Sequence, residues 1–214
     1  MSRGVAKGPK KSERVVVYID GFNLYHGLRD RGWKKYDWLD LWKLSQALCR
    51  PNQTLTQVKY FTSKISKPAE KRKRQEKYLS ALGTLVKLSI HFGRYQTFRE
   101  RCKKCGRVYY DTNEKRIDVN IATHMLVDAF QDTFDTAILI SADSDLTLPL
   151  KEIARLYPAE YGKVAFPPMR SSFDLQTAVQ TTCQIFETKI RNSQFPSHVK
   201  LASGYTFVKP RSWS

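Results

Sequence analysis

Two short apolar segments of this chain are each followed directly by acidic residues. Residues 15–19 (VVVYI) lead into Asp20, and residues 137–140 (AILI) lead into the sequence SADSD at 141–145. Unbroken runs of this length and composition are typical of strands that are buried on both faces of a parallel sheet. The pattern predicts two central strands with acids at their carboxyl ends, where open α/β sheets place their ligand sites.

The remaining apolar pattern predicts alternating helices and strands. We expect helices in residues 23–30, 38–49, 69–85, 118–130, 146–156 and within 173–190, and further strands in residues 57–63, 87–95 and 163–166. Residues 96–115 form a polar excursion, and the C-terminal residues 203–213 are expected to be extended. This alternation predicts a three-layer α/β/α sandwich with a mainly parallel central sheet.

The predicted topology brings acidic side chains together. If the two central strands are neighbours, Asp20 lies close to Asp143 and Asp145, and Asp118 approaches from the start of the helix beside them. Carboxylates at this distance repel one another unless a cation compensates their charge. Mg²⁺ and Mn²⁺ are the hard, oxygen-seeking ions that suit such a site. The alternative for each aspartate is helix capping, for which Asp is also favoured.

The charge of the chain indicates a polyanionic partner. Its 214 residues include 37 Lys and Arg against 20 Asp and Glu, which gives a net charge of +17. Such an excess attracts nucleic acid, although a merely solubilising surface is the alternative. We find no apolar run long enough for a membrane span, and the basic N-terminus lacks the apolar core of a secretory signal. A reducing, cytoplasmic setting is the expectation.

Three stretches resemble the NYN domains of the PIN-like ribonuclease superfamily, in the LabA-like (DUF88) branch. They are IDGFNLYHGL, EKRIDVNIATHML and TAILISADSDLTLPLKEI, and the ending YTFVKPRSW is also similar to that branch. The resemblance implies a PIN-like fold and metal-dependent cleavage of RNA. It implies that the catalytic and metal-binding acids are Asp20, Asp118, Asp143 and Asp145. It adds Asn23 as a polar neighbour, with Ser141 and Ser144 as auxiliary residues.

The chain departs from the family pattern at three positions. His124 stands six residues after Asp118, where family members often carry a further acid, and Ala142 and Leu146 replace Gly and Phe. His124 removes a negative charge, and it either weakens a second metal position or contacts phosphate. His26 and His124 are also candidate general acids, with helix packing as the alternative.

Basic residues cluster in and near the predicted helix 69–85, and this cluster is the candidate phosphate-binding face. A solvated helix face is the alternative. The predicted RNA-binding residues are Lys64, Lys67, Lys71, Arg72, Lys73, Arg74, Lys77 and Arg94. Four aromatic residues alternate with arginines in residues 94–110, a mixture that suits either stacking on unpaired bases or a strand core.

Two cysteines in the polar excursion have the spacing of a zinc knuckle. Cys102 and Cys105 precede Gly106. Tetrahedral zinc needs four ligands, and this segment offers two thiols. A structural Zn²⁺, a reduced surface pair, and a metal shared between subunits all remain open.

The sequence therefore predicts a disordered basic arm at 1–14, an NYN/PIN-like domain at 15–190 with a CxxC-bearing insertion near 96–116, and an extended tail at 191–214 packed on the domain. The predicted function is a ribonuclease that uses Mg²⁺ or Mn²⁺. The alternative is an RNA-binding PIN-like module with little or no catalysis. RNA is the expected partner, a membrane is not, and a homodimer is possible.

Overall fold

The protein is built on a sheet of six parallel strands. The computed structural model describes residues 12–159, 161–201 and 204–213, and gives only the backbone of residues 94–100, 109–115 and 211. From one edge to the other, the strands are β3 (Leu88–Phe92), β2 (Gln53–Thr62), β1 (Glu13–Asp20), β6 (Thr136–Ile140), β7 (Tyr161–Phe166) and β8 (Thr181–Gln184). The prediction that the two acid-bearing strands are central neighbours is confirmed, because β1 pairs with β6.

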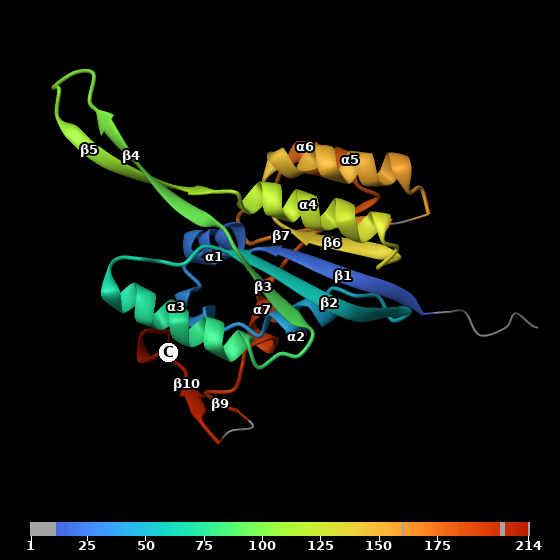
Figure 1. Cartoon of the computed structure of the whole chain (residues 1–214). Coiled ribbons are helices and arrows are strands. Elements are labelled where there is room, and N and C mark those ends of the chain that lie inside the picture. Colours follow the sequence, from blue (N-terminus) through green and yellow to red (C-terminus); the bar gives the residue numbers. More distant parts are fainter. Residues whose placement is uncertain (1–11, 160, 202–203, 214) are drawn as a thin grey trace, which may run out of the picture.

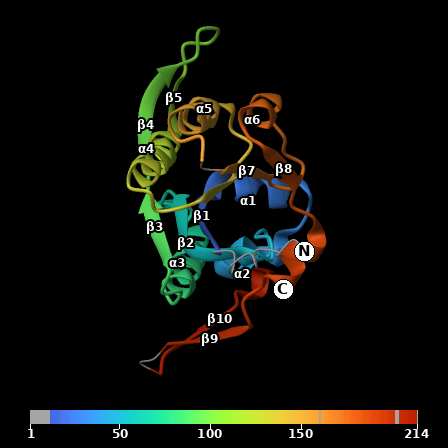
Figure 2. The ribbon, with the colours of Figure 1, turned by 90° about the vertical axis from the view of Figure 1, so that its right-hand side faces the viewer.

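One face of this sheet is covered by helices that pack apolar side chains against it. They are α4 (Ile117–Phe130), α5 (Thr147–Leu156) and α6 (Phe173–Ala178), and α5 follows the short 3₁₀ helix η2 (Ser144–Leu146). Figure 2 shows these helices stacked on one side of the strands. Ile121 and Met125 of α4 are fully buried against Val16 and Tyr18 of β1, which point to this face.

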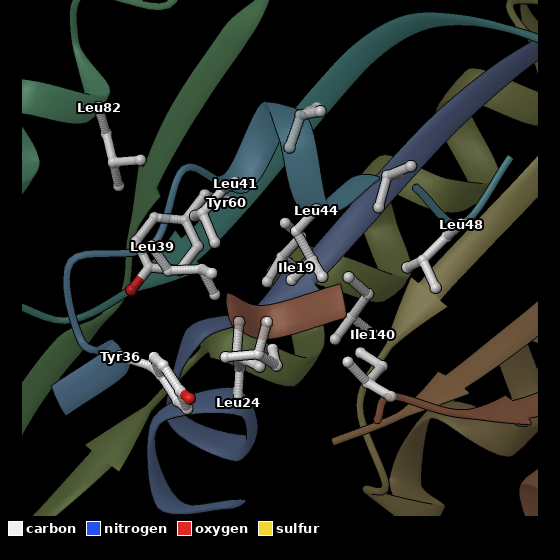
Figure 3. Packing of buried hydrophobic residues seen from close by; sticks show 14 of the residues in the cluster. Ile19, Leu24, Tyr36, Leu39, Leu41, Leu44, Leu48, Tyr60, Leu82 and Ile140 are labelled. Carbon is white, nitrogen blue, oxygen red and sulfur yellow. The ribbon is translucent and has the colours of Figure 1, made fainter. Parts of the chain in front are cut away.

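The opposite face carries the second apolar core. Its helices are α1 (Gly21–Asp30), η1 (Lys34–Tyr36), α2 (Leu41–Gln46), α3 (Ala69–Leu82) and α7 (Glu187–Asn192). Val15, Val17 and Ile19 alternate with the residues of the first face and join this core. Figure 3 shows Ile19 packed among side chains from α1, α2, β2 and β6. Two helical layers with a buried sheet between them confirm the three-layer PIN-like fold.

The predicted polar excursion at residues 96–115 forms most of a β-hairpin. Strands β4 (Arg94–Arg101) and β5 (Val108–Lys115) pair antiparallel and extend away from the sheet (Figure 1). Antiparallel backbone pairing requires no apolar run, so the sequence pattern left a strand here as one of two interpretations. The CxxC motif lies in the turn at the hairpin tip.

Other element boundaries also differ from the sequence interpretation. Residues 173–190, where at least one amphipathic piece was expected, contain α6, β8 and the start of α7, and β8 is a short edge strand with the polar sequence TTCQ. β1 begins at Glu13, inside the predicted basic arm, and residues 1–11 lie outside the described residues. The tail contains a small hairpin, β9 (His198–Lys200) with β10 (Thr206–Val208), and ends in η3 (Arg211–Trp213), whose Trp213 is buried.

Candidate metal centre

Asp20 is the buried anchor of the acidic site. It ends β1 and caps α1, and 2% of its surface is exposed. Its Oδ1 accepts a hydrogen bond from the Asn23 backbone N at 3.0 Å, and its Oδ2 accepts from Asn23 Nδ2 at 2.8 Å. Ser141 Oγ donates to the same Oδ2 at 2.8 Å. Burial raises the pKa of Asp20, and these hydrogen bonds partly oppose that rise.

Sheet register brings Asp143 to the same edge. Ile19 of β1 pairs with Ile140 of β6, so the residues that follow each strand are neighbours. Ser141 connects them: its Oγ donates to Asp20 and accepts from the Asp143 backbone N at 3.0 Å. Asp143 caps η2, and its Oδ1 accepts from the Asp145 backbone N at 3.0 Å. Asp143 therefore both caps η2 and lies close to Asp20.

Asp118 reaches this edge from α4. The helix starts after Arg116, whose φ of 77° is left-handed, and Asp118 lies in its first turn. Asp20, Asp118 and Asp143 each present a ligand oxygen, and these oxygens lie within 4.8 Å of one another. Burial, followed by the charges of neighbouring carboxylates with Asp143 first, raises the pKa of Asp118 to about 6. The three carboxylates repel one another, as carboxylates this close do when no cation compensates their charge.

No lysine or arginine among the described residues forms a salt bridge with this group. Asp145 is exposed and stands outside the group of three within the described part of the chain, although its charge contributes to the raised pKa of Asp118. Asn23 lies beside the site, where its Oδ1 accepts from the Ala142 backbone N at 3.4 Å. Ser144 is exposed. An all-oxygen donor set of three carboxylates suits a hard divalent cation.

His124 packs outside the acidic group. Its ring centroid lies 4.2 Å from that of His91 and 5.5 Å from that of Phe61. Burial lowers the pKa of His124 and, together with the charge of His124, lowers the pKa of His91 to about 4. The sequence does not reveal that His91 and His124 are in contact, because one lies in β3 and the other in α4. His26 stacks on Phe22 of the same helix at 4.2 Å.

The predicted RNA-binding residues have different surroundings. In α3, Arg72 faces Glu76 at 3.6 Å and Lys73 faces Glu70 at 3.7 Å. Lys64 Nζ lies 4.8 Å from the centroid of Phe92. Lys71 and Arg74 instead line a cavity beside α1. Lys67 and Lys77 are exposed. The Arg94 side chain, like those of the neighbouring aromatic residues, lies outside the described side chains.

The CxxC motif forms an ordered turn. Cys102 N donates to Arg107 O at 2.9 Å, and Gly106 N, at a φ of 71°, donates to Cys102 O at 2.8 Å. Backbone hydrogen bonds, that of Cys105 first, lower the pKa of the Cys102 thiol. The part of the chain that the structure describes offers no third His, Cys or acid to form a metal group with this pair. Zinc binding here stays a prediction.

Comparisons with known proteins identify the family of this chain. A crystal structure of a protein of unknown function from Vibrio parahaemolyticus shares the fold, with a TM-score of 0.57 and 18% identity over 85% of this chain and 98% of that one. The 6-hydroxy-3-succinoylpyridine 3-monooxygenase HspA of Pseudomonas putida is 26% identical over 174 residues. That match spans 65% of this chain and about half, 55%, of HspA. No helix in the described residues has the length and apolarity to cross a membrane. The model of the NYN domain family matches residues 14–172, and the chain therefore belongs to the NYN domain family.

Proposed function

We propose that this chain is a metal-dependent ribonuclease that hydrolyses the phosphodiester bonds of RNA. NYN domains form a nuclease-like superfamily, and the chain brings three carboxylates together at the carboxyl edge of its sheet. The observation that carries the proposal is their approach within 4.8 Å without a basic partner among the described residues. A set of like charges held this close is stable in a ligand-binding role and costly in a purely structural one.

Asp20, Asp118 and Asp143 would hold Mg²⁺ or Mn²⁺, and their oxygen-only donor set fits either ion. When bound, the ion supplies charge stabilisation to the scissile phosphate and acidifies a water molecule. Asn23 and Ser141 fix Asp20 by hydrogen bonds and keep its oxygens aimed at the pocket. We assign Asp145, which lies beside the group and is exposed, to accept the proton that the attacking water releases.

The basic residues of α3 and its approach would hold the RNA backbone. Lys64, Lys67, Lys71, Arg74 and Lys77 carry no salt bridge within the described residues, so their charges are available to phosphates. Contacts of this kind make affinity fall as salt concentration rises. Loss of this salt dependence in a variant with several of these residues neutralised would support the assignment.

HspA carries a name that describes oxygenation of a hydroxypyridine. Identity of 26% over about half of that protein supports a common domain, and it is not evidence that this chain catalyses the reaction of HspA. The second candidate is an RNA-binding module without catalysis. The observation that favours it is His124, which replaces an acid and packs against His91 instead of facing the aspartates.

Cleavage of end-labelled single-stranded RNA separates the two candidates. The assay contains pure protein with Mg²⁺, Mn²⁺ or EDTA, and a DNA strand of the same sequence tests the choice of nucleic acid. We expect cleavage with metal, none with EDTA, and loss of at least about 100-fold in Asp20→Asn and Asp143→Asn. Asp174→Asn, an exposed helix-start acid far from the site in sequence, is the control. RNA binding without cleavage under every metal condition would establish the binding module instead.

A further inference from the structure

A cavity of about 180 Å³ lies between α1 and α3, on the face of the sheet opposite α4. Aromatic rings dominate its wall: Phe22 and Tyr25 from α1, Tyr60 from β2, Tyr78 from α3, and Trp213 from the end of the chain. Figure 3 shows Tyr60 and Leu39 side by side in this region of the core. An apolar cavity of about 150 Å³ can hold a benzene-sized ring, so this one has room for a single six-membered ring with substituents.

The cavity is also lined by polar residues whose hydrogen bonds are incomplete. Four of its lining residues carry a buried polar atom with no hydrogen-bond partner in the described part of the chain. These atoms are Arg29 Nε, Asp37 Oδ1, Ser63 Oγ and Trp213 Nε1. Donors and an acceptor are both present, and the Asp37 side chain is 3% exposed. Unpaired buried groups are disfavoured, so a ligand that carries its own donors and acceptors on a flat ring would satisfy those that face the cavity.

The wall of the cavity includes basic residues and the residue that follows Asp20. Lys71 and Arg74 line it, and neither has a salt bridge among the described residues. Arg74 is close enough to Asp37 that its charge lowers the pKa of that carboxyl, which burial raises to about 6. Gly21 also lines the cavity and directly follows Asp20. A phosphate attached to a ring in the cavity therefore has Lys71 and Arg74 as basic partners.

We propose that this cavity binds the base of a pyrimidine nucleotide, with the nucleotide's phosphate held by Lys71 and Arg74. Aromatic walls accommodate the ring by stacking, and the mixed donor and acceptor set matches the edge of a pyrimidine, which carries both kinds of group. A single ring matches this volume better than a fused double ring does. One consequence rests on the proposed function: RNA is cut next to a pyrimidine, because Gly21 in the cavity wall directly follows Asp20 of the acidic group.

Binding is tested without catalysis, by calorimetric titration in EDTA at 0.15 M salt. The probes are uridine, uridine 5′-monophosphate, adenosine 5′-monophosphate and ribose 5-phosphate. Uridine has no phosphate, so its binding reports the cavity alone, whereas ribose 5-phosphate reports nonspecific attraction to the basic surface. We expect uridine and uridine 5′-monophosphate to bind. We expect the adenine nucleotide to bind at least tenfold more weakly than its uridine counterpart, and ribose 5-phosphate to show no saturable binding.

Two variants locate the site. Ile65→Trp places a large ring at the half-buried cavity wall without altering the deep core, and abolishes uridine binding. Arg74→Ala weakens the binding of uridine 5′-monophosphate about tenfold, as expected for loss of one charge-assisted contact. It changes the affinity for uridine less than twofold. Arg72→Ala, an arginine of the same helix that does not line the cavity, is the matched control and leaves both unchanged.

The outcomes separate this inference from the ribonuclease proposal. Failure of uridine to bind the wild-type protein, or equal binding in Ile65→Trp, overturns the cavity assignment whatever the cleavage assay shows. Equal affinity for the adenine nucleotide overturns the single-ring specificity. Conversely, uridine binding that persists in Asp143→Asn while this variant fails to cleave RNA supports the cavity as a site distinct from the metal centre.

Discussion

Replacing Asp118 by Asn should stabilise the metal-free protein at neutral pH. The carboxyl of Asp118 lies within 4.8 Å of those of Asp20 and Asp143, and its pKa is about 6 instead of the ordinary 3.8. A raised pKa means that the folded chain binds the proton more tightly than the unfolded chain does. The penalty is therefore absent below pH 3.8, develops as the pH rises, and is complete above pH 6. The neutral amide of Asn has no such penalty.

The shift of roughly two pKa units corresponds to about 3 kcal/mol. Partial exposure of Asp118 screens the charge, which reduces this figure to about 1–2 kcal/mol. Loss of a negative charge from the first turn of α4 removes about 0.3–1 kcal/mol of favourable interaction with the helix dipole. The net gain is about 1 kcal/mol, which raises the melting temperature of a chain of this size by about 2–4 °C.

Thermal unfolding in EDTA, followed by circular dichroism from pH 3.5 to 8, measures this effect. Asp174→Asn is the matched control, because Asp174 also lies in the first turn of a helix but is exposed and outside the acidic group. Added Mn²⁺ reverses the order: wild-type protein gains about 2.7 kcal/mol at 100 times the dissociation constant, whereas Asp118→Asn gains much less. A variant that is less stable than wild type in EDTA at pH 7.5, or equally stabilised by Mn²⁺, would refute the reasoning.

Three further predictions concern the surroundings of the site. Gly21→Ala should destabilise the protein by about 1–3 kcal/mol in urea unfolding, because its Cβ would lie 2.6 Å from the backbone oxygen of Phe61. Lys59→Met should destabilise it by about 3–5 kcal/mol, because Asp128 would lose its buried cationic partner at 2.6 Å. Adding Asp128→Leu should restore only part of the loss, because it removes the unpaired charge and also the acceptor of the Tyr18 hydroxyl. His91 should remain neutral at pH 5.5 in an NMR titration, because burial lowers its pKa to about 4. The protein should lose stability as the pH falls from 6.5 to 4, because the unfolded chain then binds a proton that the folded chain does not. An ordinary titration midpoint near 6.5 would contradict the packing described for His91.

The buried strands were predictable because their signal is local. β1 and β6 are covered on both faces, so their residues are apolar whichever way they point, and the runs VVVYI and AILI are visible without knowledge of the fold. The bounds of β4 and β5 were not predicted, for the opposite reason. The two strands pair through their backbones, and their sequences, RYQTFRER and VYYDTNEK, contain no long apolar run. The edge strand β8 was hidden in the same way.

The approach of Asp20, Asp118 and Asp143 was also predictable, because strand ends and helix starts fix where these side chains lie. The exclusion of Asp145 from that group was not. It depends on the backbone of η2, where the Asp145 amide bonds to Asp143 and the side chain turns to solvent. The cavity could not be predicted either, since its wall combines residues from Gly21 to Trp213 that no local pattern connects.

The charge distribution implies that metal and RNA strengthen each other's binding. The net charge of +17 attracts a polyanion from a distance, but the acidic group repels a phosphate that comes close. A divalent cation on Asp20, Asp118 and Asp143 would convert that repulsion into attraction. Linkage then requires that bound RNA increase the affinity for the cation by the same factor. In binding measured within seconds of mixing, before appreciable cleavage, Mn²⁺ should therefore increase the RNA affinity of wild-type protein. In Asp118→Asn the increase should be much smaller, and its RNA affinity in EDTA should exceed that of wild type because one repelling charge is gone. Wild-type RNA affinity that does not respond to Mn²⁺ would mean that the phosphate never approaches these carboxylates, and the hydrolytic role would then fail with it.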